Sequence, residues 1–184
     1  MKKFLVLLFL VLSTLTCFSQ VRISEQGKEF IKKQESCVLT AYWDANGYSI
    51  GYGHHGKDVY EGMVITKTQA EHYFEKDIAS VQKSVQKMID ELPYKCKFSQ
   101  GFIDGFISFT YNVGSGNARK SIFYQRLKKC RVKNGVINKE DLEYAMAGIK
   151  LSIIRCAVHK QRRAGEYKLM KTEFIEEDVK ITSA

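Results

Sequence analysis

The sequence lacks the features that usually divide a chain into separate domains. It has one proline, Pro93, and it contains no Pro/Gly/Ser-rich linker, no low-complexity tract and no internal repeat. Boundaries between domains commonly fall in linkers of that composition, so no boundary is predicted. A single domain with a hydrophobic core is expected after the N-terminal segment.

Signatures of metal and nucleic-acid binding are also missing from the sequence. No two cysteines are spaced as C-x-x-C, the commonest pattern of a zinc site. The basic residues are scattered and accompany no nucleic-acid-binding motif, as in the groups within residues 32–33, 128–131 and 160–163. We therefore predict no metal, no cofactor and no nucleic-acid partner.

The longest apolar run lies at the N-terminus, in MKKFLVLLFLVLSTLTCFSQ. A basic start, a short apolar stretch and small or polar residues near Ser19 are typical of a secretory signal peptide. The apolar stretch is short for a bilayer span. We expect residues 1–19 to be removed, which leaves residues 20–184 as a secreted or periplasmic domain. Loss of Lys2 and Lys3 lowers the formal net charge from +9 to +7, and a basic protein is attracted to anionic polymers.

Four cysteines remain after residue 19. An exported protein meets an oxidising compartment, in which disulfides form. Four cysteines allow three pairings, and the sequence does not choose among them. These residues are Cys37, Cys96, Cys130 and Cys156.

Capping residues and apolar periodicity predict an α+β fold that is mainly helical. Ser24, Ser99 and Asn138 are expected N-caps, and Thr66 with Gln69 forms a capping box. Tyr-, Gly- and β-branched-rich residues 38–65 predict a hairpin or three-stranded sheet. Helices are expected over residues 24–36, 66–92, 99–114, 121–128, 139–148 and 153–169.

Two carboxylates stand out at the start of this sheet region. Glu35 ends the first predicted helix, eight residues separate it from Asp44, and glycines recur at positions 47, 51, 53 and 56. Glycosidic cleavage needs one carboxyl group to protonate the leaving oxygen and another to assist the attacking water. This pattern alone does not identify a site, because pairing of Glu35 with a basic residue such as Arg162 would explain it equally well.

Four further sequence motifs accompany these two carboxylates. Glu35 and Asp44 precede SIGYGH (residues 49–54), and ITKTQAE (65–71) with Asp77, FTYNVG (109–114) and RRAGE (162–166) follow. Together these motifs resemble the phage-type lysozymes, or endolysins, of glycoside hydrolase family 24. The resemblance covers almost all of residues 20–184. It implies a two-lobed lysozyme-like catalytic domain, with a small β-sheet lobe and a helical lobe joined by a long helix.

The resemblance also implies roles for particular residues. The expected activity is that of a monomeric muramidase, which cleaves the bond between N-acetylmuramic acid and N-acetylglucosamine in peptidoglycan. Glu35 is the expected general acid, buried beside Tyr42 or Trp43, while Asp44 and Ser49 position the attacking water. The expected substrate-binding residues are Tyr42, Tyr52, Asn112 and Arg162, and the expected supporting residues are His54, Asp77 and Arg163.

One departure from the family pattern keeps alternatives open. The turn between Asp44 and the IGYGH run is one residue shorter than in the family, and Ser49 replaces a threonine. Ser keeps the hydroxyl but lacks the methyl group that fixes the rotamer. The alternatives are a lytic transglycosylase, a wall-binding homologue without catalysis, and a cationic membrane-disrupting protein. His54 is expected to pair with Asp77, and His55 to be a solvated loop residue.

Overall fold

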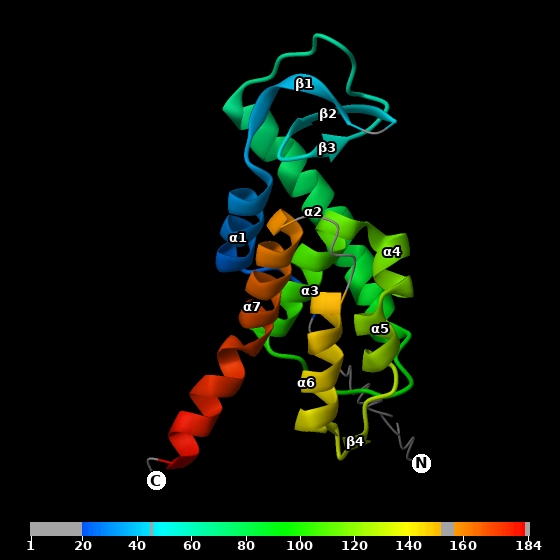
Figure 1. Cartoon of the computed structure of the whole chain (residues 1–184), viewed down its shortest axis with the longest axis vertical. Coiled ribbons are helices and arrows are strands. Elements are labelled where there is room, and N and C mark those ends of the chain that lie inside the picture. Colours follow the sequence, from blue (N-terminus) through cyan, green and yellow to red (C-terminus); the bar gives the residue numbers. More distant parts are fainter. Residues whose placement is uncertain (1–19, 45, 152–156, 183–184) are drawn as a thin grey trace, which may run out of the picture.

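The computed structural model describes residues 20–44, 46–151 and 157–182. The predicted signal peptide, residues 1–19, and Cys156 lie outside this part of the chain. A small β lobe stands at one end of the molecule and a larger helical lobe at the other, with helix α2 running from one into the other (Figure 1). The predicted two-lobed α+β architecture is confirmed. In the described residues, no helix has the length and apolar character that crossing a membrane requires.

The β lobe is a three-stranded antiparallel sheet in the order β1-β2-β3. Its strands are β1 (Val38–Asp44), β2 (Gly47–Gly51) and β3 (His54–His55). The register sets Asp44 opposite Gly47, and Ser49 lies between Tyr42 on β1 and His55 on β3. The side chain of Ser49 on β2 is therefore flanked by residues of both neighbouring strands.

Helices α1 (Glu25–Glu35) and α2 (Lys67–Asp90) flank this sheet in the sequence. Ser24 caps α1, as predicted, by accepting a hydrogen bond from the Gly27 N–H. The predicted capping box of α2 is present: the Gln69 N–H donates to Thr66 Oγ1 at 3.2 Å, and the Thr66 N–H donates to Gln69 Oε1 at 2.7 Å. Satisfying these N–H groups fixes where each helix starts.

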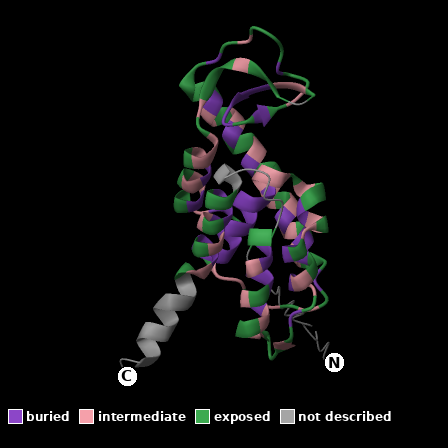
Figure 2. Cartoon of the chain, in the orientation of Figure 1, coloured by how far each residue is buried: buried purple, intermediate pink, exposed green. Residues whose placement is uncertain are grey.

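The helical lobe is built around α3 (Gln100–Val113), whose residues from Gly101 to Thr110 are all buried. Buried residues gather inside this lobe in Figure 2. The Cβ of an alanine at Gly105 would lie 2.9 Å from the Glu166 carbonyl oxygen, so glycine permits the close approach of α3 and α7. The surrounding elements are α4 (Ser115–Lys120), α5 (Ile122–Leu127), β4 (Val132–Lys133), β5 (Val136–Ile137), α6 (Lys139–Ala147), the 3-10 helix η1 (Gly148–Leu151) and α7 (Ala157–Thr182).

Three of these elements differ from the prediction. Helix α4 was not predicted, because it starts at Gly114 without a side-chain cap. The β4–β5 hairpin was missed although its turn residues Asn134 and Gly135 have positive φ angles of 53° and 77°, as the common Asn-Gly turn requires. The last helix extends beyond the predicted end at residue 169, to Thr182.

The structure contains unpaired thiols at the three described cysteines that follow residue 19. Cys37 and Cys96 are half-buried, and Cys130 is buried. The Cys130 thiol donates to the Arg126 carbonyl oxygen at 3.6 Å. Cysteine pairing thus remains a prediction.

His54 connects the β lobe to α2. Its side chain is 6% exposed, its Nδ1 lies 2.9 Å from Asp77 Oδ2, and its ring stacks on Tyr73 with centroids 4.2 Å apart. The predicted pairing of His54 with Asp77 is therefore present. A hydrogen bond to a charged group contributes more than a neutral one, and a stacked ring adds to it.

We predict that His54→Ala lowers the free energy of unfolding by about 2–4 kcal/mol, since it removes this hydrogen bond and the ring contact. The matched control is His72→Ala, an exposed histidine on α2, which should change it by less than about 0.5 kcal/mol. Urea denaturation measures both. Equal midpoints for the two variants would contradict the role of His54.

Candidate active site

Glu35 is the last residue of α1 and lies where the helical lobe meets the β lobe. Its side chain is 19% exposed, and Arg162 Nη1 donates a hydrogen bond to its Oε1 at 2.5 Å. The other oxygen, Oε2, faces Gly53, where an added Cβ would lie 3.7 Å away. One oxygen of Glu35 is therefore held by a guanidinium, while the other is directed towards the glycine-containing turn of the β lobe.

Arg162 is itself held on several sides. It is 3% exposed, its Nε donates to Glu166 Oε1 at 3.1 Å, and its Nη2 donates to the Ser108 carbonyl oxygen at 3.3 Å. The Ser108 hydroxyl also donates to Glu166 Oε1, at 2.9 Å. Buried charges are tolerated when they are paired and hydrogen-bonded in this way. The network ties α1, α3 and α7 together at Glu35.

This burial corrects the prediction that Arg162 binds substrate. The guanidinium faces protein groups, so of the roles weighed for Arg162 the structure favours steadying Glu35. Arg163 is also 3% exposed, and it donates to Glu166 and to Asn112 Oδ1. Asn112, a second expected substrate-binding residue, is half-buried with its amide oxygen engaged by this arginine.

Asp44, the second carboxylate, ends β1 and is exposed. Its Oδ2 lies 3.5 Å from the Ser49 hydroxyl. Ser49 is only 1% exposed, and its oxygen lies 3.1 Å from His55 Nδ1. His55 is exposed to solvent, as expected, but it lies on strand β3 and not in a loop, and its ring hydrogen-bonds Ser49 on the neighbouring strand.

The charge of Glu35 acts on two tyrosines. The pKa of the Tyr42 hydroxyl is raised by partial burial and then by the negative charges of Asp44 and Glu35. The pKa of Tyr111 is raised by burial and then by the charges of Asp77 and Glu35. The Tyr111 hydroxyl donates to the Tyr52 carbonyl oxygen at 2.8 Å, which fastens α3 to the β lobe.

Two other aromatic residues do not lie where the sequence placed them. Tyr52 is 5% exposed, and its hydroxyl donates to Glu71 at 2.7 Å and accepts from Lys67 at 2.6 Å. That position makes Tyr52 a core residue with an occupied hydroxyl instead of a substrate contact. Trp43 is 64% exposed and packs edge-on against Tyr48, so it does not bury Glu35.

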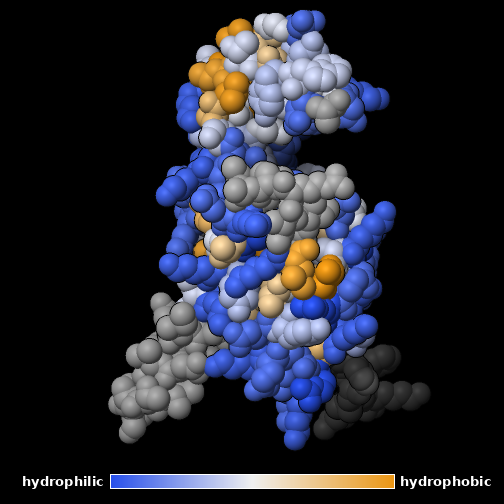
Figure 3. Space-filling view, in the orientation of Figure 1, coloured by the Kyte–Doolittle hydropathy of each residue, from blue (hydrophilic) through white to orange (hydrophobic). Residues whose placement is uncertain are grey.

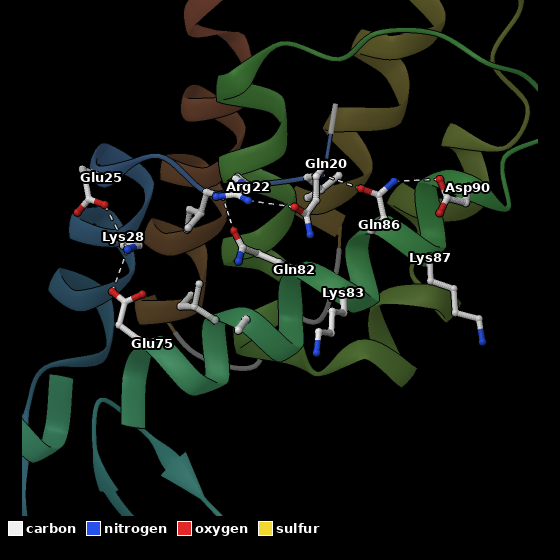
Figure 4. Close-up of a pocket in the computed structure, with 14 residues that line it drawn as sticks. Gln20, Arg22, Glu25, Lys28, Glu75, Gln82, Lys83, Gln86, Lys87 and Asp90 are labelled. Carbon is white, nitrogen blue, oxygen red and sulfur yellow. Dashed lines mark hydrogen bonds and ion pairs between the residues drawn. The ribbon is translucent and has the colours of Figure 1, made fainter. Parts of the chain in front are cut away.

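The surface narrows between the two lobes in the space-filling view, and the β lobe carries exposed apolar side chains (Figure 3). A polar cavity of about 620 Å³ lies elsewhere, between residues 20–28 and α2 (Figure 4). In it, Gln86 accepts from the Val21 N–H at 2.8 Å and Gln82 accepts from the Ile23 N–H at 2.6 Å. Its lining contains none of the predicted site residues, and its amides anchor the segment before α1.

The chemistry that the site residues offer is acid–base chemistry by carboxylates on two elements. Glu35 comes from a helix end and Asp44 from a strand end. In the described part of the chain, no group of three or more His, Cys, Asp or Glu side chains is arranged to hold a metal ion.

Curated relatives of the chain are phage endolysins. The endolysin of Bacillus phage PZA is 36% identical over 114 residues, which cover 60% of this chain and 42% of the relative. The endolysin of Bacillus phage B103 is 34% identical over 110 residues, 58% of this chain and 40% of the relative. The chain thus spans about two fifths of the length of these relatives.

Solved structures match over more of the chain. An endolysin from Escherichia coli O157:H7 phage FAHEc1 is 30% identical, with a TM-score of 0.64 over 83% of this chain and 94% of that one. The muramidase domain of SpmX from Asticaccaulis excentricus is 22% identical and shares the fold, with a TM-score of 0.68 over 82% and 98% of the two chains. The family model described as phage lysozyme matches residues 32–166, a range that contains every predicted site residue. The chain belongs to the phage lysozyme family.

Proposed function

We propose that this protein is a muramidase that hydrolyses the β-1,4 bond between N-acetylmuramic acid and N-acetylglucosamine in peptidoglycan. Membership of the phage lysozyme family supports this class of reaction. The observation that carries the proposal is the position of Glu35, which is held on one oxygen by buried Arg162 and directs its other oxygen towards the β lobe.

In the proposed mechanism, Glu35 is the general acid. Its Oε2 carries the proton and gives it to the glycosidic oxygen as the bond to the anomeric carbon breaks. Arg162 fixes the carboxyl group through Oε1, so that the proton stays on the side of the substrate. Positive charge develops on the sugar ring during this step.

Asp44 is the proposed general base. It lies on the β lobe, accepts a proton from the water that attacks the anomeric carbon, and stabilises the developing positive charge. Because Ser49 is 1% exposed, we assign it the orientation of Asp44 and not direct contact with the water. Tyr42, which is 39% exposed and whose pKa is raised by burial and by the charges of both carboxylates, is the proposed contact for the sugar.

The proposed setting is the cell wall after export. We infer that residues 1–19 direct export and that residues 20–184 act as a monomer without a cofactor. The net positive charge favours binding to the anionic wall polymer, because long-range attraction raises the local concentration of an oppositely charged partner.

We expect Glu35→Gln to lower the rate of wall clearing by about 100-fold or more, since it removes the transferable proton while keeping the shape of the side chain. Asp44→Asn tests the base in the same way. The measurement is the decrease in turbidity of purified wall, with thermal melting to confirm that each variant folds. Equal clearing by wild type and Glu35→Gln would contradict the role of Glu35 as the general acid, and no clearing by either would favour a wall-binding protein.

We further expect Arg162→Met to lower the free energy of unfolding by about 3–5 kcal/mol, because Glu35 and Glu166 would lose their buried partner. The control is Lys160→Met on the same helix, where the lysine is exposed and the change should stay within about 0.5 kcal/mol. Denaturant unfolding compares the two variants. A loss in Arg162→Met no larger than in the control would show that the network does not hold Glu35.

A further inference from the structure

His55 forms a hydrogen bond with Ser49 and has no role in the proposed mechanism. In the ladder it stands opposite Ser49, and its Nδ1 lies 3.1 Å from the Ser49 hydroxyl oxygen. The same hydroxyl lies 3.5 Å from Asp44 Oδ2. An imidazole, a hydroxyl and a carboxylate therefore follow one another across strands β3, β2 and β1.

The backbone opposite the imidazole is shaped to receive it. A Cβ at Gly47 would lie 2.8 Å from His55 Cε1 and 3.2 Å from its Nε2. A larger residue at position 47 would push the ring out of this position, whereas glycine leaves room for it. The contact with the His55 ring gives a steric reason for glycine at position 47. In the structure the exposed ring lies against the backbone of Gly47.

The Ser49 hydroxyl has a single proton and two lone pairs. When it donates that proton to Asp44, the group at His55 Nδ1 must carry a hydrogen and donate to the Ser49 oxygen. When Nδ1 is bare, the serine proton turns to the histidine and Asp44 loses a donor. The state of His55 Nδ1 thus determines where the hydroxyl proton points.

We propose that His55 is a positioning residue for hydrolysis: by donating from Nδ1 to Ser49, it directs the serine hydroxyl to the carboxylate of Asp44. This inference rests on the proposed function. Serine lacks the methyl group that restricts the rotamer of threonine, so an outside partner is needed to fix its hydroxyl. Ser49 is 1% exposed, so protein groups supply that partner. Tyr42 stands opposite Ser49 in the β1–β2 ladder, and Asp44 is the charged group beside the Ser49 hydroxyl.

The first test compares kcat and KM on soluble, uncross-linked peptidoglycan strands. We expect His55→Ala to lower kcat by about 10-fold with KM unchanged, because the base is misplaced while sugar binding persists. His55→Asn, whose amide places an N–H near the position of Nδ1, should recover most of kcat. Gly47→Ala should resemble His55→Ala, since it displaces the ring without removing it. The control His72→Ala should match wild type.

The second test is a double-mutant cycle with Ser49→Ala. If His55 acts through Ser49, adding His55→Ala to Ser49→Ala should lower kcat by less than about twofold. Full multiplication of the two single losses, or a wild-type kcat in His55→Ala, would overturn the inference while leaving the muramidase proposal intact. A wild-type rate no higher than that of Glu35→Gln would instead overturn the proposed function and this inference with it.

Discussion

The buried guanidinium of Arg162 is the interaction on which the site depends. It joins Glu35 at the end of α1 to Glu166 on α7 and to a carbonyl oxygen of α3, which are far apart in the sequence. Removing one partner from such a group leaves an unpaired buried charge, which is strongly destabilising. The close approach of α3 and α7 at Gly105 brings the arginine into place. The same contacts therefore pack the helical core and orient Glu35, the proposed acid.

The second carboxylate is oriented by a different lobe. Asp44 belongs to the sheet, and the sheet is fastened to the helices by His54 on Asp77 and by the Tyr111 hydroxyl on the Tyr52 carbonyl. The proposed acid and base thus stand on separate elements whose relative position is set by hydrogen bonds outside the proposed site. Such supporting contacts determine how accurately reacting groups are placed, and small displacements there are costly to catalysis.

Local signals in the sequence predicted the elements well wherever a side chain closes a helix end. Ser24, Thr66, Ser99 and Asn138 all cap as expected. The start of α4 at Gly114 has no such signal. It was harder to predict whether a side chain faces solvent or packs inside the protein. Periodicity does not tell whether an arginine such as Arg162 faces solvent or a buried glutamate, and the hydroxyl of Tyr52 is occupied by residues brought together only in the fold. His55 gained its partner through the register between β2 and β3, which the sequence pattern alone does not give.

The proposed hydrolysis by Glu35 and Asp44 uses water as the nucleophile. The most direct measurement is mass spectrometry of muropeptides released from purified wall in water enriched in ¹⁸O. Hydrolysis by Glu35 and Asp44 should give products that carry one ¹⁸O at the reducing N-acetylmuramic acid. Glu35→Gln should release no such products. Release of anhydro-muropeptides without ¹⁸O would contradict it, because the sugar's own hydroxyl would then be the nucleophile.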